Sequence, residues 1–192
     1  MIMRILKSMA LASALCCATA QAVPILTLAP SGGAISGTPG ATVGWGFTLT
    51  NTTDYLVVSS ASFIPATPLG TFTDFISAFN FFVVGPAPDS TSVSQIFDAL
   101  NQAGIGSFAI DAGALVGAVA SGQIILTYDL FSVSPNDPLF DPGTDTLSNG
   151  NTLAANASVT VAASISGVPE PASLLLLAAG LIALYGARRR RG

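Results

Sequence analysis

The sequence of 192 residues predicts a mainly β fold, an antiparallel β-sandwich with one short helix. Segments in which apolar and polar residues alternate recur between turns rich in Gly, Pro, Asn and Ser. A single segment has helical periodicity, so helices do not alternate with strands as they would in an α/β sheet. The spacing of these short strands favours an Ig-like sandwich over other all-β arrangements.

Residues 42–50 form the clearest predicted strand. Four apolar side chains alternate there with Thr and Gly: Val43, Trp45, Phe47 and Leu49. Such a period of two is typical of a strand with one buried face, and turn residues stand before it at 39–40 and after it at 51–54. We therefore expect Trp45 to lie in the core rather than to stack on a sugar at the surface.

Four further segments have β character. We expect residues 55–64 to pair with the preceding strand as a hairpin, and residues 71–84 to form a strand pair or one long bent strand that ends at the turn 85–88. Residues 122–133 are again rich in β-forming residues. The last predicted strand, 158–165, places four apolar residues on one face: Val159, Val161, Ala163 and Ile165.

One helix is predicted at residues 92–103. Apolar residues recur there at i, i+3, i+4 and i+7: Val93, Ile96, Phe97 and Leu100. Ser92 and Gln95 have the spacing of a capping box, and Gly104 stands where a C-terminal cap belongs.

The charges are segregated along the chain. The net charge is −4, and the six bases lie at the two ends: Arg4, Lys7, Arg188, Arg189, Arg190 and Arg191. Nucleic-acid binding is excluded for the central body, since neutralising phosphates requires Lys or Arg. The absence of histidine from the sequence excludes Ser-His-Asp catalysis and His-ligated zinc. We predict that the protein is not an enzyme.

Residues 1–22 have the three parts of a signal peptide. Arg4 and Lys7 supply the positive segment, an uncharged apolar run follows, and Ala20 and Ala22 form a small-x-small cleavage site. Signal peptidase is therefore an expected partner, and cleavage after Ala22 would leave Val23 first. Both cysteines lie inside the segment that is removed, so the exported chain would contain no disulfide.

The C-terminal end predicts a membrane anchor. Residues 172–187 carry no charge and would form a helix of about 24 Å, somewhat short of a hydrocarbon core of about 30 Å. The four arginines at 188–191 then act as a basic stop on the cytoplasmic side. Taken alone, this pattern indicates a simple tail anchor.

The residues before that helix resemble a known sorting signal. The segment resembles the PEP-CTERM motif of exported bacterial proteins. The resemblance lies in the residues Val168, Pro169, Glu170 and Pro171, in the short apolar run and in the final arginines. The two prolines keep the segment extended, and the helix can begin only after Pro171. The resemblance implies exosortase as a processing partner, a transient stay in the inner membrane, and delivery to the cell surface or extracellular matrix. It also implies a bacterium that produces exopolysaccharide and biofilm.

The candidate chemistry of the central body is sparse. The densest group of oxygen ligands includes Asp137, Asp141 and Asp145, which we regard as weak candidates for Ca²⁺ because the EF-hand spacing is not met and the same residues make ordinary turns. Residues 104–109 match a loose dinucleotide fingerprint in the wrong structural context. Asn51 and Asn156 begin glycosylation sequons. No cofactor is predicted beyond this possible Ca²⁺.

The sequence thus predicts three parts: a signal peptide at 1–22, an exported β-sandwich domain at 23–167 and a PEP-CTERM signal at 168–192 with its transmembrane helix at 172–187. Our leading hypothesis is a structural or adhesive protein sorted to the surface or matrix, with exopolysaccharide as a possible partner. The alternative is a carbohydrate- or calcium-binding module held by a simple C-terminal anchor. A hydrolase that uses Asp is the third hypothesis.

Overall fold

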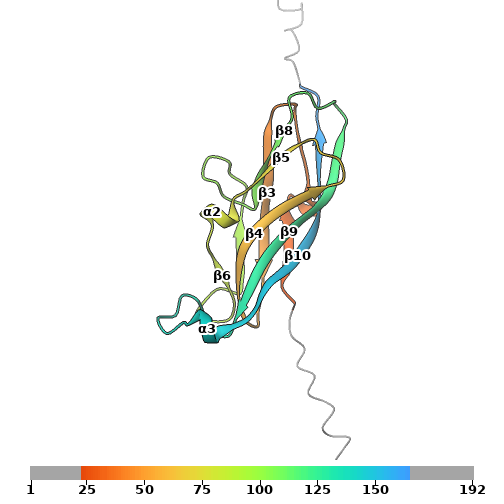
Figure 1. The fold of residues 1–192 in the computed structure, drawn as a ribbon. Coiled ribbons are helices and arrows are strands. Elements are labelled where there is room, and N and C mark those ends of the chain that lie inside the picture. The colour runs from red at the N-terminus through yellow and green to blue at the C-terminus, as the bar shows by residue number, and fades with distance from the viewer. Residues whose placement is uncertain (1–22, 165–192) are drawn as a thin grey trace, which may run out of the picture. The chain divides into compact units, whose positions relative to one another are not determined.

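The computed structural model describes residues 23–164, without the side chains of Ala78 and Phe79, and the strands in it form two five-stranded sheets (Figure 1). The first sheet has the order β1 (Ile25–Ala29), β3 (Thr42–Thr50), β8 (Gly106–Ile110) and β5 (Gly70–Asp74), with β7 (Ser92–Gln95) also paired to β3. The second sheet has the order β2 (Ala34–Gly37), β10 (Thr146–Val161), β9 (Val119–Phe131), β4 (Tyr55–Pro65) and β6 (Val83–Val84).

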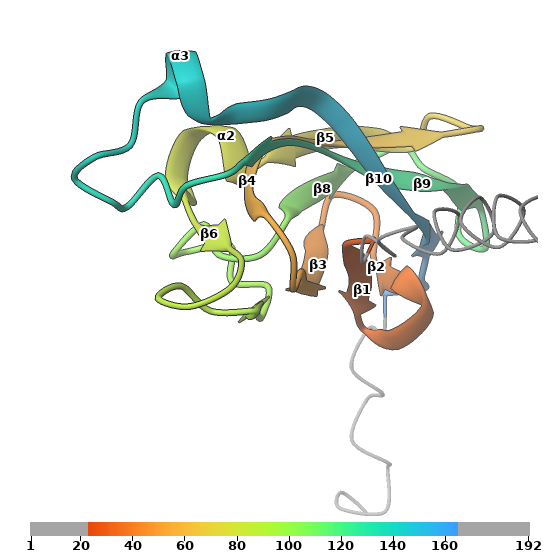
Figure 2. The same ribbon diagram turned by 90° about the horizontal axis from the view of Figure 1, so that it is seen from below.

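The two sheets pack face to face as a β-sandwich, which confirms the predicted fold class. Figure 2 shows β1 and β3 on one side of the core and β9 and β10 on the other. The core takes large side chains from both sheets: Trp45, Phe47, Leu49, Phe108, Leu56, Phe63, Ile124, Leu126, Val159 and Val161. Burial of this apolar surface is the main source of the stability of the fold.

Strand β3 follows the predicted alternation. Trp45, Phe47 and Leu49 are buried, with exposed fractions of 1% or less. The ring of Trp45 lies against Phe63 of the opposite sheet, with 5.0 Å between the ring centroids. The predictions of this strand and of a core position for Trp45 are therefore confirmed.

The hairpin predicted between residues 42–50 and 55–64 is wrong. The second segment is a strand, β4, but it pairs with β9 and β6 in the other sheet. The turn at 51–54 carries the chain across the sandwich, and the Asn51 side chain stabilises it by donating hydrogen bonds to the carbonyls of Asp54 and Val84. Because β3 and β4 each have one apolar face, placing them in opposite sheets buries both faces against each other.

The segment 71–84 is also divided between the sheets. Its first part belongs to β5, which pairs with β8, and its last part is β6, which pairs with β4. The single helical turn α2 (Ile76–Phe79) lies between them, so the predicted strand pair and the alternative of one long bent strand are both wrong. The predicted turn at 85–88 is confirmed.

The helix predicted at 92–103 is wrong. Residues 92–95 form β7, which pairs with β3 from Phe47 to Thr50, beyond the point where β8 leaves the same edge of that strand. Loop residues follow, in which Ile96 and Leu100 are 84% and 95% exposed. The unfilled hydrogen-bonding edge of β3 thus prevails over the local helical pattern. The other described helices are the single turns η2 (Ser31–Gly33) and α3 (Pro142–Asp145).

The two long strands β9 and β10 confirm that strands lie in the predicted segments 122–133 and 158–165, although β9 ends at Phe131 and β10 at Val161. Strand β10 has 16 residues and begins at Thr146, 12 residues before the predicted start at Ser158. Val159 and Val161 share its buried face, Ala163 lies beyond its end, and Ile165 is outside the described residues. The pairing of β10 with β2 is parallel, so the sheet is mixed rather than wholly antiparallel. The Ig-like connectivity remains a prediction.

Candidate functional site

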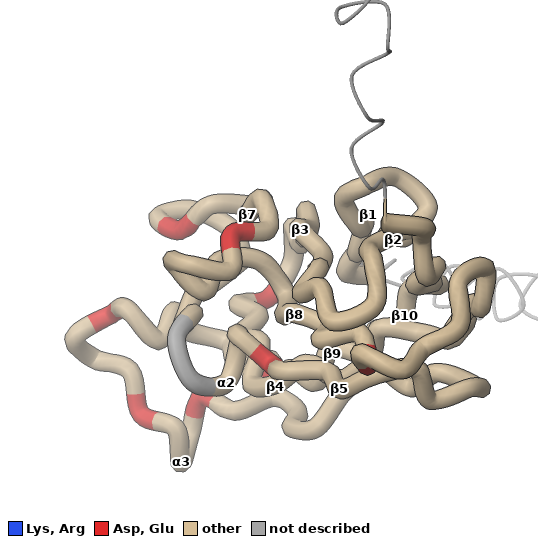
Figure 3. Tube along the Cα trace, turned by 90° about the horizontal axis from the view of Figure 1, so that it is seen from above, with Lys and Arg blue, Asp and Glu red and all other residues tan. Residues whose placement is uncertain are grey.

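The acidic residues gather at one end of the sandwich. Residues 23–164 contain nine aspartates and no base, and the tube in Figure 3 accordingly shows red segments and no blue one. Six aspartates lie on or beside the loops that join β3 to β4, β6 to β7 and β9 to β10: Asp54, Asp89, Asp129, Asp137, Asp141 and Asp145. We call this region the acidic end.

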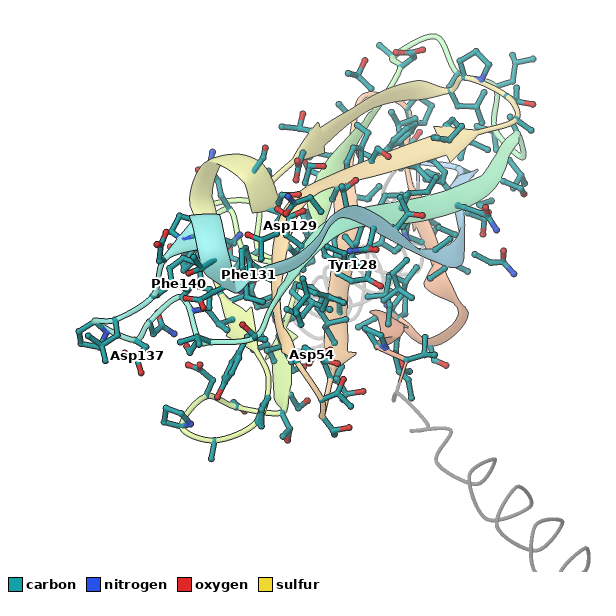
Figure 4. All side chains as sticks on the ribbon, turned by 60° about the horizontal axis from the view of Figure 1, so that its bottom comes forward. Asp54, Tyr128, Asp129, Phe131, Asp137 and Phe140 are labelled. Atoms are coloured by element: carbon teal, nitrogen blue, oxygen red, sulfur yellow. The ribbon has the colours of Figure 1, made fainter. Side chains whose placement is uncertain are left out.

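The predicted calcium ligands do not converge there. Asp137 and Asp141 each accept a hydrogen bond from the backbone amide two residues later, at Leu139 and Gly143, both at 2.8 Å. Asp145 accepts one from the amide of Asp141, also at 2.8 Å. Figure 4 shows Asp137 on an outlying loop, well apart from Asp54 and Asp129.

Within residues 23–164, no group of three or more acidic, His or Cys side chains is arranged to hold a metal ion. Instead the carboxylates bind backbone amides and so fix the turns that carry them, with Asp141 as the N-cap of α3. Their arrangement fits a structural role in the loop better than Ca²⁺, which needs several oxygens directed at one point.

A polar contact that the sequence did not reveal joins the loop between β9 and β10 to the loop between β6 and β7. Asp89, between β6 and β7, accepts hydrogen bonds from the hydroxyl of Ser134 and from Nδ2 of Asn136, the latter at 2.8 Å. Ser134 is buried although it lies in a loop. The sequence gives no local signal for this contact, because Asp89 and Ser134 are 45 residues apart.

The loop that stands in place of the predicted helix is stabilised by hydrogen bonds to the carboxylate of Asp98. Asp98 accepts hydrogen bonds from Nδ2 and the amide of Asn101 and from the amide of Leu100. These bonds, that from the Asn101 side chain first, lower the pKa of the Asp98 carboxyl below its ordinary value because they favour the charged form. Asp98 therefore acts as a turn former in this loop.

The fingerprint at 104–109 has a packing explanation. A side chain at Gly106 would collide with the carbonyl of Thr73 and the ring of Phe72, and Gly104 has a φ of +100°. These glycines allow β8 to lie close to β5, and the segment is followed by no helix that could receive a pyrophosphate.

The best surface for stacking a sugar is formed by Phe81, not by Trp45. Trp45 is fully buried, and its Nε1 donates a hydrogen bond of 2.8 Å to the carbonyl of Gly33. Phe81 is 69% exposed and lines a surface pocket of about 380 Å³ together with Ser59, Ser77 and Asn80. An apolar ring beside hydroxyl and amide groups is a composition that suits the binding of a small polar ligand such as a sugar.

The two sequons differ in accessibility. Asn51 is 3% exposed and its amide nitrogen already donates to two carbonyls, so it is closed to glycosylation in the folded chain. Asn156 lies on an exposed position of β10 and accepts a hydrogen bond from Gln123 at 3.4 Å.

The sorting and cleavage residues lie outside the described residues. These are Ala20, Ala22, Val168, Pro169, Glu170, Pro171, Arg188, Arg189, Arg190 and Arg191. Within residues 23–164, no helix is long and apolar enough to span a membrane. Strand β1 begins at Ile25, three residues after the predicted cleavage site.

The similar solved structures resemble this chain only weakly, as three of them show. A C. elegans MSP family member aligns at 9% identity over 71% of this chain and 97% of its own, with a TM-score of 0.33. The sixth cohesin of Acetivibrio cellulolyticus scaffoldin B aligns at 12% over 73% and 99%, with a TM-score of 0.30. CaCohA2 from Clostridium acetobutylicum aligns at 23% over 72% and 92%, with a TM-score of 0.24. All three TM-scores lie below 0.5, so these likenesses assign neither fold nor function.

Comparisons by sequence are informative only at the C-terminal end. No curated protein matches the chain. Residues 167–191 match the family model of the PEP-CTERM protein-sorting motif, which is the resemblance that the Pro-Glu-Pro core, the apolar run and the arginines indicated. The match covers the tail and does not extend into the β-sandwich. The chain therefore ends in a PEP-CTERM protein-sorting motif.

Proposed function

We propose that this protein is an exported, non-catalytic β-sandwich that its tail delivers to the cell surface or extracellular matrix, where it acts as a structural or adhesive component. Signal peptidase removes residues 1–22, and residues 172–187 hold the chain in the inner membrane. Exosortase then processes the tail near Val168–Pro171. The observation that carries this proposal is the PEP-CTERM motif at residues 167–191.

The described residues support a role without catalysis. Three carboxylates of the acidic end, those of Asp137, Asp141 and Asp145, accept hydrogen bonds from backbone amides of their own loop. A general acid or base instead needs a carboxyl directed at a substrate pocket.

The mass of the intact protein in membrane and extracellular fractions tests the sorting proposal. We expect the wild-type chain to lose residues at both ends, and a strain without exosortase to retain the tail in the membrane. Replacing Pro169, Glu170 and Pro171 together by Ala should have the same effect as the loss of exosortase. Ser173→Ala, two residues beyond the motif, is the matched control and should be processed normally.

A full-length polypeptide that is soluble inside the cell with residues 1–22 still attached would contradict the proposal. Normal processing of the triple alanine variant would contradict the role of the motif, because the prolines that keep the segment extended would then be unnecessary. Retention of an intact tail in wild-type cells that contain exosortase would favour the simple tail anchor.

A second candidate function, carbohydrate binding, is favoured by the pocket beside Phe81. Calorimetry with a panel of polysaccharides and with Ca²⁺ separates it from a purely structural role. Heat of binding to a polysaccharide that disappears in Phe81→Ala, but not in the distant Leu139→Ala, would establish this candidate. Binding of Ca²⁺ that disappears in Asp141→Asn would establish calcium binding instead. Hydrolysis that is lost in any single Asp→Asn variant would establish the third hypothesis.

A further inference from the structure

The end of the sandwich opposite the acidic end is formed by three loops beside the last residues of β10. These loops are residues 38–41, 66–69 and 111–118, and we call them the exit tip. The amide of Gly117 donates to the carbonyl of Val161 at 2.8 Å, and the amide of Val161 donates to that of Ala118 at 2.9 Å. The loop 111–118 is thus bound directly to the point where the chain leaves the fold.

The exit tip exposes apolar side chains. Leu115 is 79% exposed and its neighbour Val116 is 59% exposed. Leu115 also lines a surface pocket of about 450 Å³ with Pro68 and Leu69 from the adjacent loop. The amide of Asp111 joins the two loops by donating to the carbonyl of Leu69 at 2.9 Å. These contacts hold the apolar surface in place across two loops.

The exit tip also differs from the acidic end in charge. Its three loops contain one charged residue, Asp111, whereas the acidic end holds six aspartates. An anionic surface repels the acidic end over about one Debye length, roughly 8 Å at physiological ionic strength. Next to a bilayer that contains anionic lipid, the orientation with the exit tip toward the lipid is therefore the favoured one.

The length of chain beyond the fold places a bilayer within reach. The compact unit that contains the sandwich ends at Ala162, and the uncharged run begins at Ala172. The nine residues between them extend at most about 32 Å at roughly 3.3–3.6 Å per residue. A tether this short gives an effective concentration in the mM range, so a contact too weak to recruit a free protein is enough.

We propose that the exit tip rests on the bilayer surface while the tail is inserted, with Leu115 and Val116 in contact with lipid. This inference rests on the proposed anchoring of residues 172–187. A lipid surface is the occupant because the exposed residues are small aliphatic side chains beside the tethered end of the chain. The bilayer contact would also present the acidic end to the exterior and hold the sorting motif at the membrane surface.

Spin labels at two matched leucines test the proposal. The chain from Val23 to Gly192 contains no cysteine, so Leu115→Cys and Leu139→Cys each give a single nitroxide site. Leu139 is 87% exposed at the acidic end. Each labelled chain, purified from cells without exosortase, is placed in vesicles of phosphatidylethanolamine with a minority of phosphatidylglycerol. Relaxation by oxygen, which enters lipid, is compared with relaxation by a water-soluble nickel chelate.

We expect the ratio of oxygen to nickel accessibility to be several-fold larger at residue 115 than at residue 139. Val116→Asp in the Leu115→Cys chain should lower the ratio to that of residue 139 without changing flotation with the vesicles. Flotation with equal ratios at the two sites would overturn the proposal and leave the anchor intact. Failure to float would overturn the anchor and the proposal together. Spin–spin broadening at residue 115 at low protein density would show a second copy on the tip and also overturn it.

Discussion

Two adjacent glycines in the turn between β1 and β2 test how closely this turn packs against β10. Gly32 and Gly33 both have positive φ, +79° and +67°, so an alanine at either position is strained by about 1–2 kcal/mol. The reduced entropy of the unfolded chain offsets about 0.4–1 kcal/mol of this strain. Nothing lies within 4 Å of the place that a side chain would occupy at Gly32. We therefore expect Gly32→Ala to lower the free energy of unfolding by about 1 kcal/mol.

Gly33→Ala should cost considerably more. Its methyl group would collide with the carbonyl oxygen of Asn156 in β10 and lie 2.7 Å from Cδ1 of Leu28. The chain must then move, which strains the core by about 1–3 kcal/mol. The movement also breaks the bond from Trp45 Nε1 and leaves that buried donor unpaired, at about 1–3 kcal/mol. Together with the strain in φ, we expect a loss of about 4 kcal/mol.

Urea unfolding followed by far-UV circular dichroism and by the fluorescence of Trp45 measures both variants. Thermal unfolding gives a second readout: a loss of about 1 kcal/mol lowers the Tm of a domain of this size by about 4 °C, and a loss of about 4 kcal/mol lowers it by about 15 °C. The emission of Trp45 should change in folded Gly33→Ala and stay unchanged in folded Gly32→Ala. Free energies of unfolding that agree within about 1 kcal/mol for the two variants would refute the close approach to β10.

Three further predictions concern the core and the charges. Trp45→Phe should lower the free energy of unfolding by about 3 kcal/mol in urea, since it removes the bond to Gly33 and leaves a cavity, whereas a loss below about 1 kcal/mol would contradict that account. Asn101→Ala should raise the pKa of Asp98 toward 3.8 in an NMR titration. Because that pKa is lowered in the fold, its stabilising effect is present above pH 3.8 and is lost as the pH falls through the lowered pKa, and a pKa unchanged by Asn101→Ala would refute the cause. Added NaCl should raise the Tm by weakening repulsion among the aspartates, and a Tm independent of salt would show that this repulsion is negligible.

The strands were predictable where a single local pattern decides the structure. In β3 the alternation of Val43, Trp45, Phe47 and Leu49 leaves one way to bury the large residues. The choice of pairing partner was not predictable, because β4 joins β9 through contacts that lie far apart in the sequence. The turn at 51–54 serves equally well for a hairpin or for a crossing between sheets.

The helix predicted at 92–103 does not form, because pairing with β3 outweighs the local helical signals. Its capping-box spacing and apolar periodicity are local signals, whereas β7 forms because the edge of β3 beyond Trp45 is free to pair. Gly44 and Gly46 carried a contrary signal, since glycines inside a strand often mark a close backbone approach. A side chain at Gly44 would collide with the ring of Phe97, which lies in the loop that follows β7.

The functional features also divide into those that a local sequence pattern reveals and those that depend on contacts between distant segments. The PEP-CTERM motif is linear, so its residues are readable in order along the chain. The contact of Asp89 with Ser134 and the apolar surface of the exit tip each depend on loops brought together by the sheets. The acidic segment was visible, but its sequence did not show that Asp137 and Asp141 direct their oxygens to the backbone of their own turns.

The parallel pairing of β2 with β10 determines how the sandwich bears mechanical load. A pull on the tail enters the fold at Val161, where the last four residues of β10 are bonded to β2 on one side and residues 158–160 also to β9 on the other. Ladder bonds run across the strands. A force applied between the tail and the acidic end acts along β10, so it shears many of these bonds at once instead of opening them one after another. Forced rupture is governed by the rate of unfolding, which this geometry slows. In the proposed adhesive role, the domain would therefore be loaded along the direction in which it resists unfolding most.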